Sequence, residues 1–75
     1  KAASSLRAVE AGLGLLKKGG LMTLCIYSGG DSGFEEKEAL LQYIRTLPAG
    51  EFLVLETRYA NRSGNPPIPV LIIRL

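Results

Sequence analysis

The first stretch with residues suited to chemistry is Y-S-G-G-D-S-G, residues 27–33. It offers a phenol in Tyr27, a carboxylate in Asp31 and two small residues, Gly29 and Gly30. Tyr27 could stack on a substrate or pack as an amphipathic ring. Asp31 could be a general base or a substrate contact, or it could cap the helix that follows. The glycines allow either an ordinary turn or the close approach of a ligand to the backbone.

The second stretch is N-R-S-G-N-P-P, residues 61–67. It contains a guanidinium in Arg62, an amide in Asn65 and two consecutive prolines, Pro66 and Pro67. The prolines remove two backbone donors and stiffen the loop, which a simple hairpin does not require. A binding role therefore competes with a purely structural one.

Several kinds of site are excluded by the residue types. The glycines of the first stretch form neither G-x-G-x-x-G nor a G-K-[ST] phosphate loop. One cysteine and no histidine cannot make an internal disulfide or a Cys/His zinc site. The glutamates at 35, 36 and 38 suit the positive end of a helix dipole better than a cation, so no metal is expected.

Composition predicts one small domain over residues 1–75. The 75 residues are 47% hydrophobic, and a chain of this size buries only about 60% of its unfolded surface. The net charge of +2 does not by itself indicate nucleic acid or a membrane surface. Apolar runs are short and no signal segment opens the chain, so we expect a soluble protein with no membrane partner. The single cysteine, which can form no disulfide within the chain, favours a reducing cytoplasmic setting.

Two helices and three strands are predicted around these stretches. Apolar residues at helical spacing indicate a helix over residues 4–18, capped by Ser4 or Ser5 and ended by K-K-G-G. L-M-T-L-C-I-Y, residues 21–27, is apolar almost throughout, which is typical of a central strand covered on both faces. A second helix follows from Phe34 to Leu47 and ends at Pro48.

Strands are predicted over residues 51–60 and 68–75, which makes the order α-β-α-β-β and the fold class α/β. A helical crossover normally joins parallel strands, and a short loop most simply joins antiparallel ones. The first two strands should then end at one edge of the sheet, where residues 1–5, 28–33 and 61–67 would converge. Ligands of open α/β sheets bind at this edge.

Three sequence patterns stand out: L-L-K-K-G-G before an apolar strand, Y-S-G-G-D-S-G-F-E-E-K, and N-x-x-x-N-P-P. Together they resemble the C-terminal half of the rRNA methylase family. These are class I S-adenosylmethionine-dependent methyltransferases, and they include the bacterial enzyme that methylates 5-aminomethyl-2-thiouridine at the tRNA wobble position. The resemblance covers essentially the whole chain. Many relatives carry a histidine where this chain has Gly30, so the resemblance implies no histidine contact here.

The resemblance implies that the three strands are the fifth to seventh of a seven-stranded Rossmann-like sheet, with the last strand antiparallel between the other two. The loops that hold S-adenosylmethionine would precede Lys1, so this chain alone would bind no cofactor and would be inactive. The partner of the intact enzyme would be tRNA or rRNA. Tyr27 and Asn65 would face the base, Gly29, Gly30, Asp31, Pro66 and Pro67 would form the substrate wall, and Lys1 and Arg62 would contact phosphates.

A different class of function is also open. The chain could be a stand-alone α/β interaction module that forms homo-oligomers through sheet edges, because an unpaired apolar strand is a template for another chain.

Overall fold

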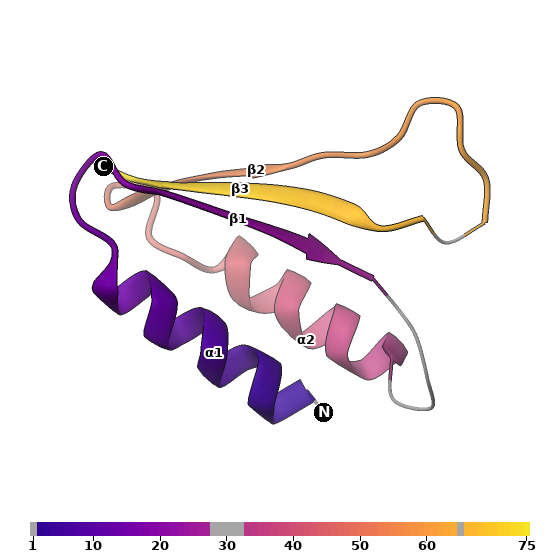
Figure 1. The fold of residues 1–75 in the computed structure, drawn as a ribbon, viewed down its shortest axis with the longest axis horizontal. Coiled ribbons are helices and arrows are strands. Elements are labelled where there is room, and N and C mark those ends of the chain that lie inside the picture. The colour runs from indigo at the N-terminus through magenta and orange to yellow at the C-terminus, as the bar shows by residue number, and fades with distance from the viewer. Residues whose placement is uncertain (1, 28–32, 65) are drawn as a thin grey trace.

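A computed structural model of the protein describes residues 2–27, 33–64 and 66–75, with side chains at 5–27, 35–64 and 66–75. The elements are α1 (Ala2–Leu15), β1 (Leu21–Ile26), α2 (Gly33–Arg45), β2 (Phe52–Glu56) and β3 (Ile68–Arg74). The predicted order of two helices and three strands is confirmed (Figure 1).

The ends of several elements differ from prediction. Because α1 begins at Ala2, Ser4 and Ser5 lie inside its first turn, and the prediction that one of them caps the helix is wrong. The helix ends at Leu15, and Gly19 then takes a left-handed φ of 81°. The Gly19 amide donates to the carbonyl of Arg74 at 2.7 Å, which ties the turn to the end of β3. No helix in the described part of the chain is long and apolar enough to cross a membrane.

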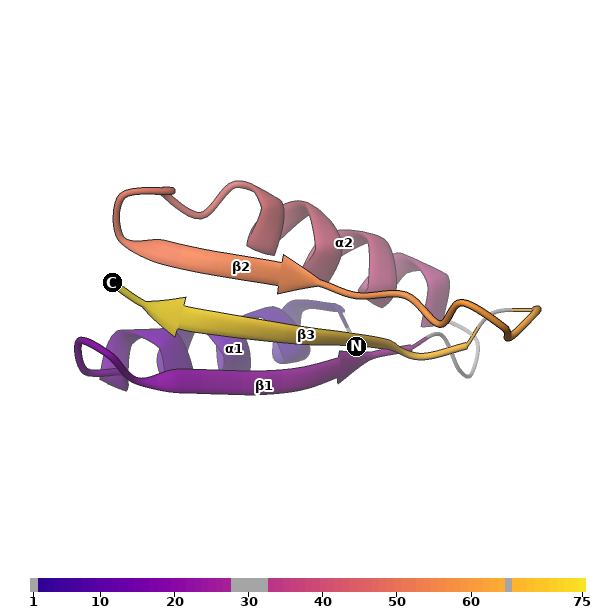
Figure 2. The same ribbon diagram turned by 90° about the horizontal axis from the view of Figure 1, so that it is seen from above.

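The sheet has the strand order β1-β3-β2, and both of its strand pairs are antiparallel. The predicted place of the last strand, antiparallel between the other two, is confirmed. The predicted parallel relation needs correction: β1 and β2 share a direction only because each is antiparallel to β3, and they form no parallel pair. The loop after β2 is long enough to return β3 between them, so the crossover helix joins two strands that are not neighbours (Figure 2).

One face of the sheet carries the core. Both helices lie on this face (Figures 1 and 2). Alternate residues of the strands point toward them, and the register places Ile26 opposite Ile68, and Met22 and Val54 opposite Ile72 on its two sides. The buried hydrophobic side chains of the described residues are Leu13, Ile26, Leu41, Ile44, Ile68, Val70 and Ile72.

The opposite face, which we call the open sheet face, is apolar and exposed. Leu21 is 54% exposed, and Leu53 and Leu55 are each 45% exposed. The register places Ile73 between Leu21 and Leu53, and no described element covers this row. The prediction of residues 21–27 as a central strand covered on both faces is therefore wrong within the described chain, because β1 lies at a sheet edge and one of its faces is bare.

An ion pair joins α2 to β2 across the surface. Arg45 donates from Nε and Nη2 to the two carboxylate oxygens of Glu56, at 2.9 and 2.7 Å. Arg58 donates to the same carboxylate at 3.0 Å. The hydrogen bond from Arg45 lowers the pKa of Glu56 below its ordinary value, and burial opposes this in part. The two-point geometry makes this pair stronger than a typical surface pair.

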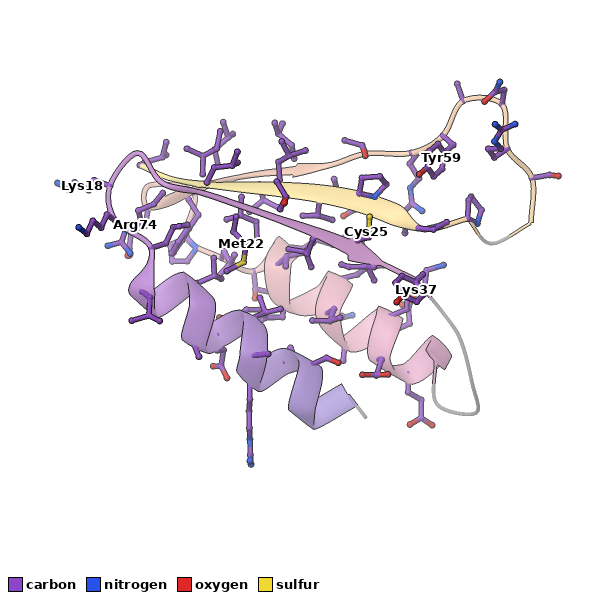
Figure 3. All side chains as sticks on the ribbon, in the orientation of Figure 1. Lys18, Met22, Cys25, Lys37, Tyr59 and Arg74 are labelled. Carbon is purple, nitrogen blue, oxygen red and sulfur yellow. The ribbon has the colours of Figure 1, made fainter. Side chains whose placement is uncertain are left out.

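Two glycines of α1 should respond differently to alanine. An added Cβ at Gly12 would lie 2.5 Å from Cε of Met22, whereas nothing lies within 4 Å of one at Gly14. Figure 3 shows Met22 between β1 and α1. We expect Gly14→Ala to raise the free energy of unfolding by up to ~1 kcal/mol through helix propensity. Gly12→Ala should gain less than Gly14→Ala in urea titrations, because the Met22 methyl must move to make room. Equal gains would mean that the flexible end of Met22 moves at no measurable cost.

The pair of Arg45 and Glu56 predicts a pH dependence of stability. A lowered folded pKa means that the stabilisation is complete above the ordinary glutamate value of 4.5 and is lost as the pH falls through the folded pKa. Urea unfolding at pH 7 and at about pH 3 should therefore show a smaller acid loss for Glu56→Gln than for the unchanged protein. Glu51→Gln, at an exposed carboxylate, is the matched control. If Glu56→Gln loses as much free energy of unfolding in acid as the unchanged protein does, the ion pair does not contribute to the pH dependence.

Candidate functional site

Several helices and strands of the described chain have an end at one edge of the sheet. The carboxyl ends of β1 and β2 and the first turns of α1 and α2 lie at the same end of the molecule (Figure 1). The Ser5 hydroxyl donates to Oε1 of Glu36, so the starts of the two helices are in direct contact. This end, which we call the functional edge, carries two adjacent pockets.

The first pocket, the tyrosine pocket, has a volume of about 330 Å³ and surrounds the end of β1. Its described lining is Ser5, Cys25, Tyr27, Glu36 and Leu40. Tyr27 is exposed, so its ring is available to a ligand. The hydrogen bond from Ser5 lowers the pKa of Glu36, which favours the carboxylate form. The pocket thus presents one apolar wall, one phenol and one anionic hydrogen-bond acceptor.

The second pocket, the basic pocket, has a volume of about 210 Å³ and lies between α2 and the loop that joins β2 to β3. Its described lining is Lys37, Arg58, Tyr59, Arg62, Gly64, Pro66, Pro67 and Ile68. Three of these side chains are cationic and none is anionic. Figure 3 shows Lys37 and Tyr59 at the same end of the molecule. Consecutive residues of α2 line the two pockets, Glu36 the tyrosine pocket and Lys37 the basic pocket.

The structure places four of the nine predicted site residues. Arg62, Pro66 and Pro67 come together in the basic pocket, as members of one wall. Tyr27 lines the tyrosine pocket. Lys1, Gly29, Gly30, Asp31 and Asn65 lie outside the described residues and stay predictions.

The sequence predicts no ligand contact for several lining residues, among them Ser5, Glu36, Lys37, Arg58 and Tyr59. It predicts that Ser4 or Ser5 caps the first helix and that Glu36 suits the helix dipole, whereas Ser5 and Glu36 together form one wall of the tyrosine pocket. Arg58 and Tyr59 were placed inside a strand predicted to reach residue 60, whereas β2 ends at Glu56. A basic and an aromatic residue side by side, immediately after an apolar run, is the signal that could have found them.

The chain has close structural relatives. The family model described as "Putative rRNA methylase" matches residues 1–73. A crystal structure of an rRNA methylase, described as putative, from Clostridium thermocellum is 36% identical and superposes with a TM-score of 0.90. A methyltransferase from Streptococcus mutans, also described as putative and solved in complex with SAH, is 29% identical and superposes with a TM-score of 0.89.

Both superpositions cover 100% of this chain but only 40% and 41% of the two solved chains. The chain therefore spans about two fifths of the length of the structures that it matches. The α/β arrangement described above is that of a methyltransferase fold. Since the family model covers nearly every residue, this chain belongs to the rRNA methylase family.

Proposed function

We propose that this chain is the C-terminal, substrate-facing part of an S-adenosylmethionine-dependent RNA methyltransferase. The observation that carries the proposal is the similarity of the whole chain to a methyltransferase in complex with SAH. The functional edge is consistent with it, because a pocket with an exposed phenol lies beside a pocket with three cations. Aromatic and cationic groups side by side suit a nucleotide, whose base stacks and whose phosphate is anionic.

The described residues of the functional edge do not fit the cofactor by themselves. Nucleoside cofactors are commonly held by a carboxylate on the ribose hydroxyls. Glu36 is the one carboxylate among the described lining residues of the two pockets, and it already accepts a hydrogen bond from Ser5. We therefore assign cofactor binding to the part of the methyltransferase fold that lies beyond this chain, and we assign substrate contacts to this chain.

The open sheet face also supports the assignment of cofactor binding to residues outside this chain. A doubly wound sheet is covered by helices on both faces, and here Leu21, Leu53 and Leu55 are exposed on one of them. The matched structures are more than twice as long as this chain, which leaves enough residues to cover that face. In this proposal the isolated 75-residue chain is catalytically inactive.

Methyl transfer asks mainly for positioning, because S-adenosylmethionine supplies an already activated methyl group when it is bound. Tyr27 would hold the substrate base by stacking, and Asn65 would hydrogen-bond its edge. Arg62 would hold the neighbouring phosphate. The substrate that we propose is the 5-aminomethyl-2-thiouridine of the tRNA wobble position, with rRNA as the alternative, in the cytoplasm.

One observation favours the second candidate function, an interaction module that forms homo-oligomers. Both β1 and β2 present an unpaired strand edge in the described sheet, beside the exposed leucines. Sedimentation of the 75-residue chain over a wide concentration range tests this second candidate. Concentration-dependent association supports edge pairing, and a monomer throughout counts against it.

The main proposal predicts methyl transfer by the full-length protein. Purified protein, methyl-labelled S-adenosylmethionine and either unmodified rRNA or tRNA bearing the 5-aminomethyl group should give label in the tRNA. Label in rRNA alone would change the substrate but keep the activity. No label in either RNA, from protein that is folded by circular dichroism, would overturn the proposal.

Asn65→Ala should lower kcat/KM for RNA methylation by about tenfold, the loss expected for one or two hydrogen bonds to the base, without changing the melting temperature. Asn61→Ala changes the same residue type in the same loop and is the matched control. Unchanged kinetics in Asn65→Ala would remove this residue from the substrate site. Equal losses in both variants would point to the loop as a whole.

A further inference from the structure

The basic pocket is organised by the loop that leaves β2. The amide and the hydroxyl of Thr57 both donate to the carbonyl of Pro69, at 3.0 and 2.7 Å. These two bonds fix the first residue of the loop to β3. Arg58 and Tyr59 follow directly, so their positions are set by the sheet rather than by the loop tip.

Arg58 is oriented by an ion pair. Its Nη2 donates to Oε2 of Glu56 at 3.0 Å, and the same carboxylate accepts two hydrogen bonds from Arg45. The guanidinium has five N–H donors, and the side chain is 59% exposed. The pair therefore holds the group in place and leaves donors directed elsewhere. With Arg45 sharing Glu56, the cluster keeps a net positive charge at the pocket.

Tyr59 and the two prolines supply the apolar part of the pocket. The ring of Tyr59 is about half exposed. Pro66 and Pro67 form a stiff wall on the same pocket, because proline fixes the backbone φ. An exposed aromatic face beside guanidinium groups is the arrangement that single-stranded nucleic acid uses, with bases on the ring and phosphates on the cations.

The volume of the basic pocket limits the size of the group that it can enclose. About 210 Å³ is less than the roughly 300–1,000 Å³ of pockets that enclose a complete small molecule. The pocket is large enough for one phosphate and the face of one base, which suits a segment of a longer strand. The tyrosine pocket lies at the same end of the molecule and is lined by Glu36, the residue before Lys37, so one strand could reach both pockets.

We propose that the basic pocket binds a single-stranded segment of the RNA substrate, with Arg58 and Arg62 on phosphodiester oxygens and a base stacked on Tyr59. This inference rests on the proposed function for the identity of the RNA. It adds Arg58, Tyr59 and Lys37 to the substrate surface and places them one nucleotide or more from the methylated base. Phosphate contacts made in this way hold the strand without reading its sequence.

The test is binding of a fluorescent single-stranded oligoribonucleotide to the full-length protein, followed by anisotropy from about 50 to 300 mM salt. Each phosphate contact contributes about −0.7 to the slope of log K against log salt for a single strand. The double variant Arg58→Gln with Arg62→Gln should therefore flatten the slope by about 1.4. It should also weaken binding roughly 20-fold at about 0.1 M salt. Lys18→Gln removes a charge at the opposite end of the molecule and is the matched control (Figure 3).

The stacking contact has a different signature. Tyr59→Leu should weaken binding about tenfold with the salt slope unchanged, because stacking releases no counterions. Tyr59→Phe keeps the ring and should bind as the unchanged protein does. Arg58→Lys keeps the charge and should restore most of the slope, which separates loss of a phosphate contact from damage to the Glu56 cluster.

Two results would overturn the inference: an unchanged salt slope in the double arginine variant, or equal losses in that variant and in Lys18→Gln. Inorganic phosphate, added as a competitor, tests whether the basic pocket binds a free anion instead of the phosphates of RNA. If phosphate binds the pocket tightly and the arginine variants lose phosphate but not RNA, the pocket serves a free anion and the inference fails. Methyl transfer is measured separately from binding. If the full-length protein methylates RNA and the pocket variants bind RNA as well as the unchanged protein does, only the role of the basic pocket is rejected. If the protein binds RNA through this pocket but transfers no methyl group, only the proposed activity is rejected.

Discussion

The insertion of β3 between β1 and β2 is the constraint on which the rest of the structure depends. Ile68, Val70 and Ile72 alternate along β3, and each is almost fully buried against the helices. Because β2 and β3 are antiparallel neighbours, the chain that leaves β2 turns back beside it through the loop of residues 57–67. This loop is longer than a tight hairpin turn, and it supplies most of the described lining of the basic pocket. The pairing of β3 with β2 therefore fixes both ends of the loop that carries the candidate RNA contacts.

The same insertion makes the two faces of the sheet unequal. On the inner face, residues opposite one another across the strands pack on α1 and α2 and exclude water. On the outer face, Leu53 and Leu55 of the short strand β2 remain exposed. Exposed leucines that line up across neighbouring strands are more than scattered surface residues, because together they form a contiguous apolar patch. An enclosed core on one side and such a patch on the other is what a part of a larger doubly wound fold should show.

The order of elements could be predicted from the sequence, because the helical spacing of Leu6, Val9 and Leu13 and the apolar runs of the strands are local signals. The position of β1 at the edge of the sheet could not be predicted from the sequence. An apolar run such as residues 21–27 shows that both faces avoid water, but it does not show whether the cover comes from this chain. Arg58 and Tyr59 were missed for a related reason: the end of β2 is set by the ion pair of Arg45 with Glu56 and by the bonds of Thr57 to Pro69, which join residues distant in sequence.

Overall charge is a poor guide to the RNA partner that we propose, and the distribution of charges in the structure explains why. A net charge of +2 is small because acidic residues at the start of α2 offset basic ones elsewhere. Folding gathers three of the cations. It brings Lys37, Arg58 and Arg62 to one pocket without a carboxylate in the described lining, while Glu56, at the end of β2, is shared by Arg45 and Arg58. A polyanion responds to the local arrangement over about a Debye length, roughly 10 Å at 0.1 M salt, and not to the sum over the chain. A nearly neutral chain can therefore present an RNA-binding surface, provided that the topology collects its cations at one edge.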